Sequence, residues 1–200
     1  MGWVLLFLAG GVGGALCDQI HVQAGVLAYA HPFVLDQAWW VAPQFGVAML
    51  VILAGARPFA LRSRGRSRML PDAALFLGAY GATGLFNRWP AGLAAALLAA
   101  WVVRVVVDES PGVLVVFSLL LAAGGTLYEG TLAGTGAFHY TRPDLYHVPL
   151  WLAGIYLDGA ALALDVARSL FTREKAGPVW ARLSRTALLS GTTGSKSRRR

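Results

Sequence analysis

The charged residues of this chain are sorted by position along the sequence, and this sorting constrains the fold more than any other feature. Long apolar stretches alternate with short charged clusters. The stretches cover residues 4–16, 38–56, 73–86, 91–107, 113–136 and 148–166. Of the 17 Lys and Arg residues, all except Arg88 and Arg142 lie at alternate ends of these stretches. Short cytoplasmic loops of membrane proteins collect Lys and Arg in this way. The sequence therefore predicts an all-α polytopic membrane protein, a bundle of six transmembrane helices.

The composition agrees with a membrane bundle that has no large domain outside the lipid. Apolar residues make up 56% of the chain and charged residues only 14%, whereas about a quarter of the residues in soluble domains are charged. A crossing helix needs about 20 residues, so six helices use about 120 of the 200. We expect residues 1–170 to form the transmembrane domain. Residues 171–200 are expected to form a basic tail, partly disordered or amphipathic, with a surface helix within residues 170–189.

Six crossings place both termini on the same side of the membrane as the basic loop at residues 57–68. By the positive-inside rule that side is the cytoplasm. The membrane is then the inner membrane of a prokaryotic cell or the endoplasmic reticulum of a eukaryotic one. The first apolar stretch lacks a basic start and a small-residue cleavage site, so it is expected to be a retained helix. Its Gly10 and Gly14 lie four residues apart and favour close approach of another helix.

Charge and cysteine content limit the partners and cofactors. The formal net charge of +7 comes largely from the 57–68 loop and the C-terminal tail, which flank apolar segments. Anionic lipid headgroups explain this charge better than nucleic acid does. Cys17 is the single cysteine, which excludes an intramolecular disulfide and a cysteine-based zinc site. We expect no metal and no cofactor, and the common hydrolase, metalloprotease and phosphate-loop motifs are absent. No catalytic residue is assigned, and we expect a protein that is not an enzyme.

Ionisable side chains inside the apolar stretches are the first candidates for function, because each costs about 2.5–3.5 kcal/mol to place in a bilayer. Glu129, Asp158 and Asp165 are such residues, and Asp18 lies at the outer part of the first helix. Asp165 is favoured to form an ion pair with Arg168 at i+3. For Glu129 two alternatives stay open: a protonated carboxyl hydrogen-bonded to the backbone or to Thr, or a side chain that lines a polar cavity or a ligand site. The same protonated form is open to Asp158.

The four histidines, His21, His31, His139 and His147, all fall in the expected outer loops at residues 20–37 and 136–147. Clustered histidines in a loop are typical of solvated interface residues, and less often of a catalytic or metal site. We therefore assign them no role.

Two motifs resemble the Insig family, the insulin-induced gene proteins of the endoplasmic reticulum. Residues 140–144 read Tyr-Thr-Arg-Pro-Asp and lead into Trp151-Leu152 and, later, Arg168. Residues 38–43 read Ala-Trp-Trp-Val-Ala-Pro, which is similar to the start of the family's second helix. The resemblance covers most of residues 3–170 and implies the same six-helix plan. The composition is rich in Ala, Arg, Gly and Val, which indicates a GC-rich bacterial source and hence a prokaryotic homologue.

The resemblance also implies an intramembrane lipid pocket. Candidate lipid-binding residues are Tyr128, Glu129, Asp158, Trp151 and Phe86. Glu129 and Asp158 stand where the family has small residues, so the fold carries over better than sterol specificity does. A sterol and a neutral glycerolipid such as diacylglycerol both fit an apolar pocket with a few polar groups.

Asp108 is the nearest match to the acidic loop that the family uses to bind partner proteins. The resemblance thus also implies regulation of membrane partners. A homo-oligomer or a complex with another membrane protein, packed through Gly10 and Gly14, is compatible with it.

The sequence favours a non-enzymatic membrane protein that holds a lipid in an intramembrane cavity. The alternative is a small membrane enzyme or a proton-coupled transporter that uses Glu129, Asp158 and Asp165.

Overall fold

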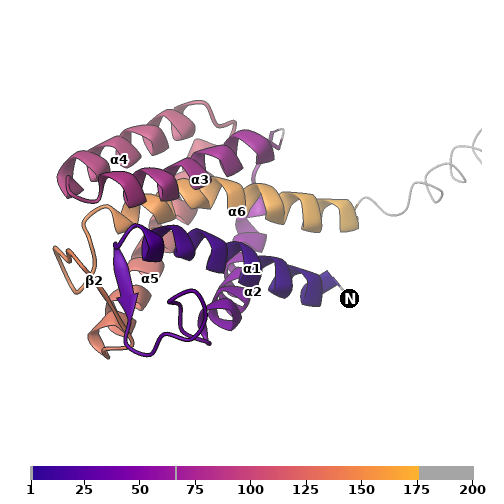
Figure 1. The fold of residues 1–200 in the computed structure, drawn as a ribbon. Coiled ribbons are helices and arrows are strands. Elements are labelled where there is room, and N and C mark those ends of the chain that lie inside the picture. The colour runs from indigo at the N-terminus through magenta and orange to yellow at the C-terminus, as the bar shows by residue number, and fades with distance from the viewer. Residues whose placement is uncertain (1, 66, 176–200) are drawn as a thin grey trace, which may run out of the picture.

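The structure is a computed structural model that describes residues 2–65 and 67–175. The described residues form six helices and one two-stranded ribbon (Figure 1). The elements in chain order are α1 (Gly2–Gln23), β1 (Leu27–Tyr29), α2 (Val41–Ala60), α3 (Met69–Phe86), α4 (Pro90–Val106), α5 (Pro111–Gly134), β2 (Phe138–Tyr140) and α6 (Leu152–Lys175). The six-helix prediction is confirmed. Helix α6 continues to Lys175, and the rest of the expected tail, with most of the expected surface helix at 170–189, lies outside the described residues.

Helix α6 forms the centre of the bundle. It packs against α2, α3, α4 and α5, and Figure 1 shows it between the α3–α4 pair and the α1–α2 pair. Four helices, α1, α2, α3 and α5, are long and apolar enough to cross a membrane, and α4 is a shorter apolar helix. Helix α6 is not among the four, since Asp158, Asp165 and Arg168 interrupt its apolar sequence. All three side chains are buried, so the surrounding helices shield the most polar helix from lipid.

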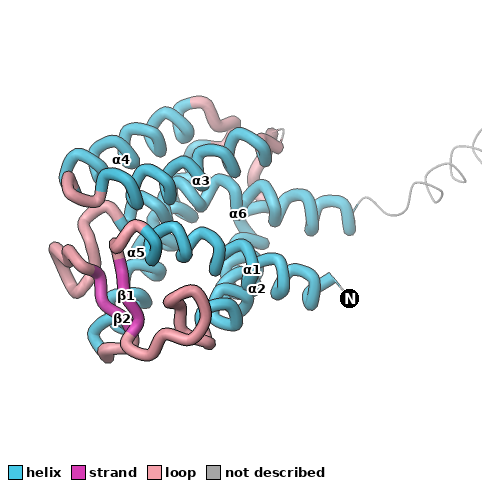
Figure 2. The backbone as a smooth tube through the Cα atoms, viewed as in Figure 1, coloured by secondary structure: helices cyan, strands magenta, loops and turns pink. Residues whose placement is uncertain are grey.

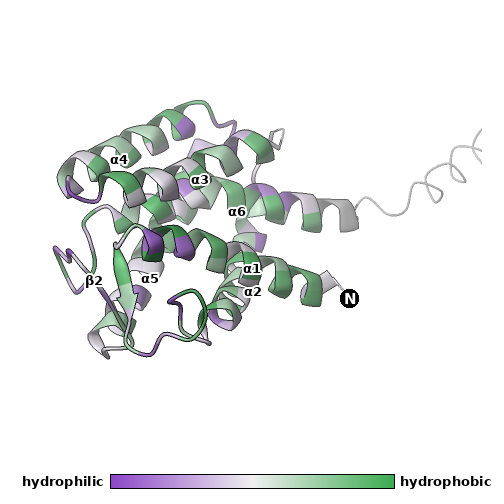
Figure 3. Cartoon of the chain, in the orientation of Figure 1, coloured by the Kyte–Doolittle hydropathy of each residue, from purple (hydrophilic) through white to green (hydrophobic). Residues whose placement is uncertain are grey.

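The outer surface of the bundle is apolar. Val4, Leu8, Val12 and Leu16 recur along the exposed face of α1, and Figure 3 shows apolar residues along the helices and polar ones near the helix ends. A soluble protein would pay the hydrophobic cost of exposing such a face to water, whereas lipid tails solvate it.

A short ribbon joins the two long loops at one end of the bundle, where the sequence predicted polar loops without strands (Figure 2). Strands β1 and β2 are antiparallel and pair Leu27 with Tyr140 and Tyr29 with Phe138. This pairing satisfies backbone groups that would otherwise be buried without partners. The fold class therefore stays all-α in its membrane part, with one ribbon added outside the helices.

The ribbon lies on a pseudo-twofold axis that relates two halves of the chain. Gly25, Tyr29, Pro32 and Trp40 recur 111 positions later as Gly136, Tyr140, Pro143 and Trp151. The backbone follows the same repeat. The loop bridge Val34–Gln37 has its counterpart in Leu145–Val148. The positive φ angles of Leu35 and Asp36 (52° and 63°) recur at Tyr146 and His147 (49° and 65°). The unit α1–β1–α2 is thus repeated as α5–β2–α6.

The glycine-rich face of α1 packs against α2 of the same chain. A Cβ atom on Gly10 would lie 2.3 Å from Cβ of Met49, and one on Gly14 would lie 2.3 Å from Cγ of Phe45. The repeat gives the same contact on the other side, where a Cβ on Gly125 would lie 2.3 Å from Cε1 of Tyr156. The close approach that the sequence predicted is therefore made within the bundle.

Buried ion pairs hold the end of the bundle opposite the ribbon. The Arg104 guanidinium donates through Nε to Asp72 Oδ1 at 2.6 Å and through Nη1 to Asp108 Oδ2 at 2.8 Å. Asp165 pairs with Arg168 at 2.9 Å, as the sequence predicted. Asp165 also accepts a bond from Ser67 Oγ at 3.1 Å and one from the Arg68 backbone N–H. The loop from α2 to α3 is thereby fixed to the central helix.

Substituting Gly14 or Gly125 by alanine should destabilise the bundle by about 1–3 kcal/mol, because the added methyl group overlaps a packed aromatic ring. Gly55→Ala is the matched control: a Cβ there meets nothing within 4 Å, and alanine is the better helix former. Thermal unfolding in detergent should show a lower melting temperature for G14A and G125A only. Equal melting temperatures for all three variants would contradict the close packing.

Removing the Arg104 charge should cost about 3–5 kcal/mol, since Arg104→Gln leaves the buried carboxylates of Asp72 and Asp108 without their cation. Arg62→Gln, on an exposed side chain of the basic loop, should change stability by no more than about 0.5 kcal/mol. Denaturation in mixed micelles measures both. A stable R104Q variant would show that the network does not hold this end.

Candidate lipid site

A large apolar cavity lies between α1, α2, α3 and α6. Its volume is about 490 Å³, within the range of about 300–1,000 Å³ that is usual for ligand pockets. Met49, Phe76, Leu77 and Leu162 are among the side chains that line it. The glycines of α1 leave room on one wall, because Gly13 has nothing within 4 Å of where its Cβ would be. The cavity can hold a hydrocarbon chain or a ring system.

A second, polar cavity of about 60 Å³ lies beside the first, near the ribbon. Phe45, Ala48, Tyr80 and Tyr156 line both cavities, so the two are contiguous. The polar cavity is also lined by the carboxylates of Asp18 and Glu129. One ligand can therefore place its hydrocarbon in the large cavity and its polar end in the small one.

The two carboxylates are equivalent positions of the repeat, 111 residues apart. Asp18 Oδ2 accepts bonds from the Tyr29 hydroxyl at 2.7 Å and from Gln37 Nε2 at 2.9 Å. Glu129 accepts bonds from the Tyr140 and Tyr156 hydroxyls. Glu129 lines the polar cavity, and its donors are the two tyrosine hydroxyls and not the backbone or threonine groups that the first alternative expected.

The tyrosines of the ribbon stay protonated. Burial, together with the charge of Asp18, raises the pKa of the Tyr29 phenol far above its usual value. Burial and the charge of Glu129 raise the pKa of Tyr140 in the same direction. Both hydroxyls are therefore fixed as donors to the carboxylates.

His21 is part of this site and not of an outer loop, where the sequence analysis put it. It lies in the last turn of α1 and is 3% exposed. Its Nε2 is 2.8 Å from Thr83 Oγ1, and its ring stacks on Tyr80 with centroids 4.9 Å apart. Helix α1 continues through His21 to Gln23, which carries the side chain inside.

The candidate lipid-binding residues fall into two groups. Tyr128 and Glu129 line the polar cavity, although the Tyr128 side chain is half exposed. Trp151, Asp158 and Phe86 line neither cavity.

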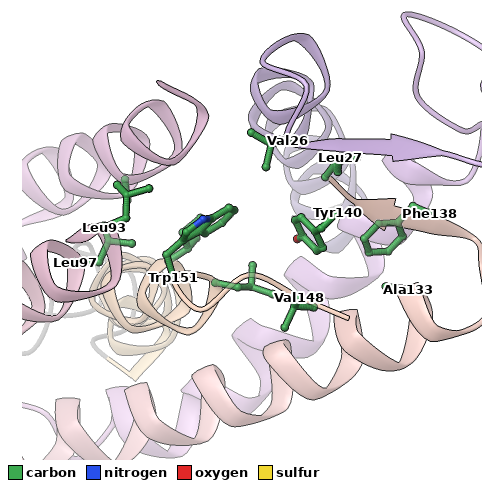
Figure 4. Close-up of a cluster of buried hydrophobic side chains, with 12 residues drawn as sticks. Val26, Leu27, Leu93, Leu97, Ala133, Phe138, Tyr140, Val148 and Trp151 are labelled. Carbon is green, nitrogen blue, oxygen red and sulfur yellow. The ribbon is translucent and has the colours of Figure 1, made fainter. Parts of the chain in front are cut away.

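Trp151 is fully buried in the core near the ribbon, where it lies between Leu93 and Leu97 of α4 and Tyr140 of β2 (Figure 4). Its Nε1 donates to Asn87 Oδ1 at 3.1 Å. Phe86 is exposed at the end of α3. Asp158 is buried in α6, and neither oxygen has a hydrogen-bond partner among the described residues.

Asp108 is engaged inside the molecule. One carboxylate oxygen pairs with Arg104, and the other accepts the Ser110 backbone N–H at 2.7 Å. Its side chain is 5% exposed. These contacts give Asp108 the role of closing the turn between α4 and α5.

Three residues of the Tyr-Thr-Arg-Pro-Asp motif make hydrogen bonds that give each of them a structural role. Tyr140 donates to Glu129, and the Thr141 hydroxyl donates to the backbone oxygen of Gly25 at 2.9 Å. Asp144 accepts the Leu150 N–H at 2.8 Å. The motif therefore joins the two halves and forms the loop that leads to α6.

Sequence reasoning did not assign Tyr29, Tyr80, Tyr140 or Tyr156 to the site. Tyr80 and Tyr156 lie in helices, where an aromatic residue gives no signal of its own. The repeat was the available signal, since it relates Tyr29 to Tyr140 and Asp18 to Glu129. Among residues 2–65 and 67–175, no three His, Cys, Asp or Glu side chains gather as a metal site would require.

The comparisons with known proteins agree with this architecture. No protein-family model matches the chain, and no curated protein matches it in sequence. Among solved structures, the chain is similar to MvINS, a mycobacterial Insig homologue from Mycobacterium vanbaalenii, with 26% identity and a TM-score of 0.68 over 83% of this chain and 92% of that one. A cross-linked trimer of a cysteine variant of MvINS gives 26% identity and a TM-score of 0.69 over 84% and 92%.

The six helices, four of them apolar enough to cross a membrane, and the likeness to MvINS over most of both chains lead to one conclusion. This chain is an Insig-like, multi-pass membrane protein of the prokaryotic type.

Proposed function

We propose that the protein is a non-enzymatic lipid-binding protein that holds a membrane lipid in the cavity between α1, α2, α3 and α6. The observation that carries the proposal is the contact between an apolar cavity of about 490 Å³ and a polar cavity lined by Asp18 and Glu129. A lipid's polar end must find hydrogen-bond partners when it leaves water. The carboxylates and tyrosines supply them at one end, while hydrocarbon fills the other.

The same chemistry narrows the ligand. Two carboxylates repel a phosphate group, and a space of about 60 Å³ is small for a phospholipid headgroup. A lipid with a small headgroup that donates hydrogen bonds suits the site. Sterols and neutral glycerolipids such as diacylglycerol belong to this class.

The geometry argues against a transporter or enzyme built on Glu129, Asp158 and Asp165. Asp165 is bonded to Arg168, Ser67 and Arg68, and Asp158 lines neither cavity. The three carboxylates therefore do not share one path through the bundle.

Assembly and regulation follow as parts of the same proposal. The trimer of the mycobacterial protein supports a homo-oligomer of this chain. A lipid that fills the space between α1 and α3 would fix their spacing, which is a route by which ligand binding regulates contacts with membrane partners.

Filling the cavity should expel the lipid. Gly13→Leu places a side chain in the space that Gly13 leaves open on the cavity wall. Gly55→Leu makes the same change on an exposed turn of α2 with nothing within 4 Å. Lipid extracted from purified protein and identified by mass spectrometry should show one enriched species in the wild type and in G55L, and at least a fivefold loss in G13L. Bulk phospholipid in bulk proportions in all three would contradict lipid binding.

We also propose that both termini and the 57–68 loop face the cytoplasm of a prokaryotic cell, at the inner membrane. The connection between α2 and α3, whose sequence includes Arg62, Arg64 and Arg68, lies at one end of the bundle, and the ribbon lies at the other (Figure 1). Fluorescent-protein reporters that mature only in the cytoplasm should be bright after residue 62 and at the C-terminus, and dark in the 31–36 loop. A dark C-terminal reporter beside a bright one after residue 62 would contradict this orientation.

A further inference from the structure

The polar cavity is lined by two acidic side chains and, among the described residues, by no Lys or Arg. The same holds for the apolar cavity beside it. Of the described residues that line the polar cavity, His21 alone carries an ionisable nitrogen. Its Nε2 lies 2.8 Å from Thr83 Oγ1. A buried charge is costly unless an opposite charge balances it. The lining therefore lacks the cation that would balance ionised Asp18 and Glu129.

The carboxylates have acceptor capacity to spare. Asp18 and Glu129 each accept bonds from two neutral donors. An ionised carboxylate offers about four lone-pair sites. Tyrosine and glutamine donors satisfy part of these sites but supply no positive charge. Each carboxylate can accept a further N–H donor without losing the bonds it has.

Tyr80 adds a polar group to the same wall. The side chain, on α3, lines both cavities and is partly buried. A phenol hydroxyl accepts hydrogen bonds as well as donating them. A ligand donor in the cavity can therefore bond to Tyr80.

The aromatic lining and the small volume of the polar cavity indicate which lipid headgroup fits it. Tyrosine rings and Trp40 make up much of the lining, and aromatic faces attract a cation. One water molecule needs about 10–15 Å³ of such space, so about 60 Å³ holds a group of only a few heavy atoms. An ammonium group on a short carbon stem meets the size, the charge and the three donors that the site calls for.

We propose that the polar cavity is a receptor for the protonated primary amine of a lipid without phosphate. The ammonium donates to Asp18, Glu129 and the Tyr80 hydroxyl, and the hydrocarbon extends past Phe45 and Tyr156 into the apolar cavity. The inference rests on the proposed lipid-binding function and names the headgroup class that the site prefers over a neutral alcohol.

The test compares two probes with the same tail, octadecylamine and octadecanol, both radiolabelled. Equilibrium binding to the purified full-length protein is measured by scintillation proximity. The wild type should bind the amine at least tenfold more tightly than the alcohol. The double variant Asp18→Asn, Glu129→Gln should lose that preference. Asp36→Asn is the matched control, because Asp36 is exposed in the outer loop and asparagine tolerates its positive φ; its preference should stay unchanged.

Tyr80→Phe is the second variant, and it removes one oxygen while leaving the ring in the core. It should weaken amine binding at least threefold with no change in melting temperature, which keeps the proposal testable if the double variant does not fold. Equal or tighter binding of the alcohol by the wild type would overturn the amine receptor and leave lipid binding standing. Binding of neither probe, with no enriched lipid in the wild-type extract, would overturn both.

Discussion

Polar groups in hydrocarbon have to find their partners inside the protein, and this constraint organises the bundle. The helix with the most ionisable side chains, α6, lies at the centre, where α2, α3, α4 and α5 cover it. Asp165 and Arg168 pair with each other there, and Arg104 serves two carboxylates at the same end. The exposed surface is left to side chains such as Val4 and Leu8, which lipid can solvate.

At the other end of the bundle, the repeated units supply each other's polar partners. Asp18 lies near the end of α1, and Glu129 lies near the end of α5. No lysine or arginine of the described chain lines the space between these carboxylates. The ribbon brings Tyr29 and Tyr140 to these carboxylates, one from each half. Pairing of β1 with β2 is what places both tyrosines correctly, because Leu27 pairs with Tyr140 and Tyr29 with Phe138 across the axis.

The helices could be predicted from the sequence because the membrane imposes length and charge on every crossing segment. The Asp165–Arg168 pair was predictable for a local reason, since residues three apart share one face of a helix. The ribbon was not predictable locally, because strands of three residues carry no period and their partner lies on the other half of the chain. The hydrogen-bond donors to Glu129 were not predicted for the same reason, because Tyr140 and Tyr156 lie in two later elements of the chain.

The two units of the repeat differ in some side chains at the site, and these differences make the site asymmetric. Phe45 and Tyr156 are equivalent positions, each packed on a glycine of the preceding helix, Gly14 and Gly125. The Tyr156 hydroxyl donates to Glu129, whereas Phe45 has no hydroxyl and Gln37 donates to Asp18 in its place.

Phe45 and Tyr156 also line both cavities. Phe45 is apolar there, whereas Tyr156 has its polar group turned to a carboxylate. Tyr80 has no counterpart among the described repeat elements, because α3 lies outside the repeated unit. The symmetric pair of carboxylates thus shares its cavity with a tyrosine from outside the repeat, and a bound headgroup would take one orientation, with its tail along α1 and α3.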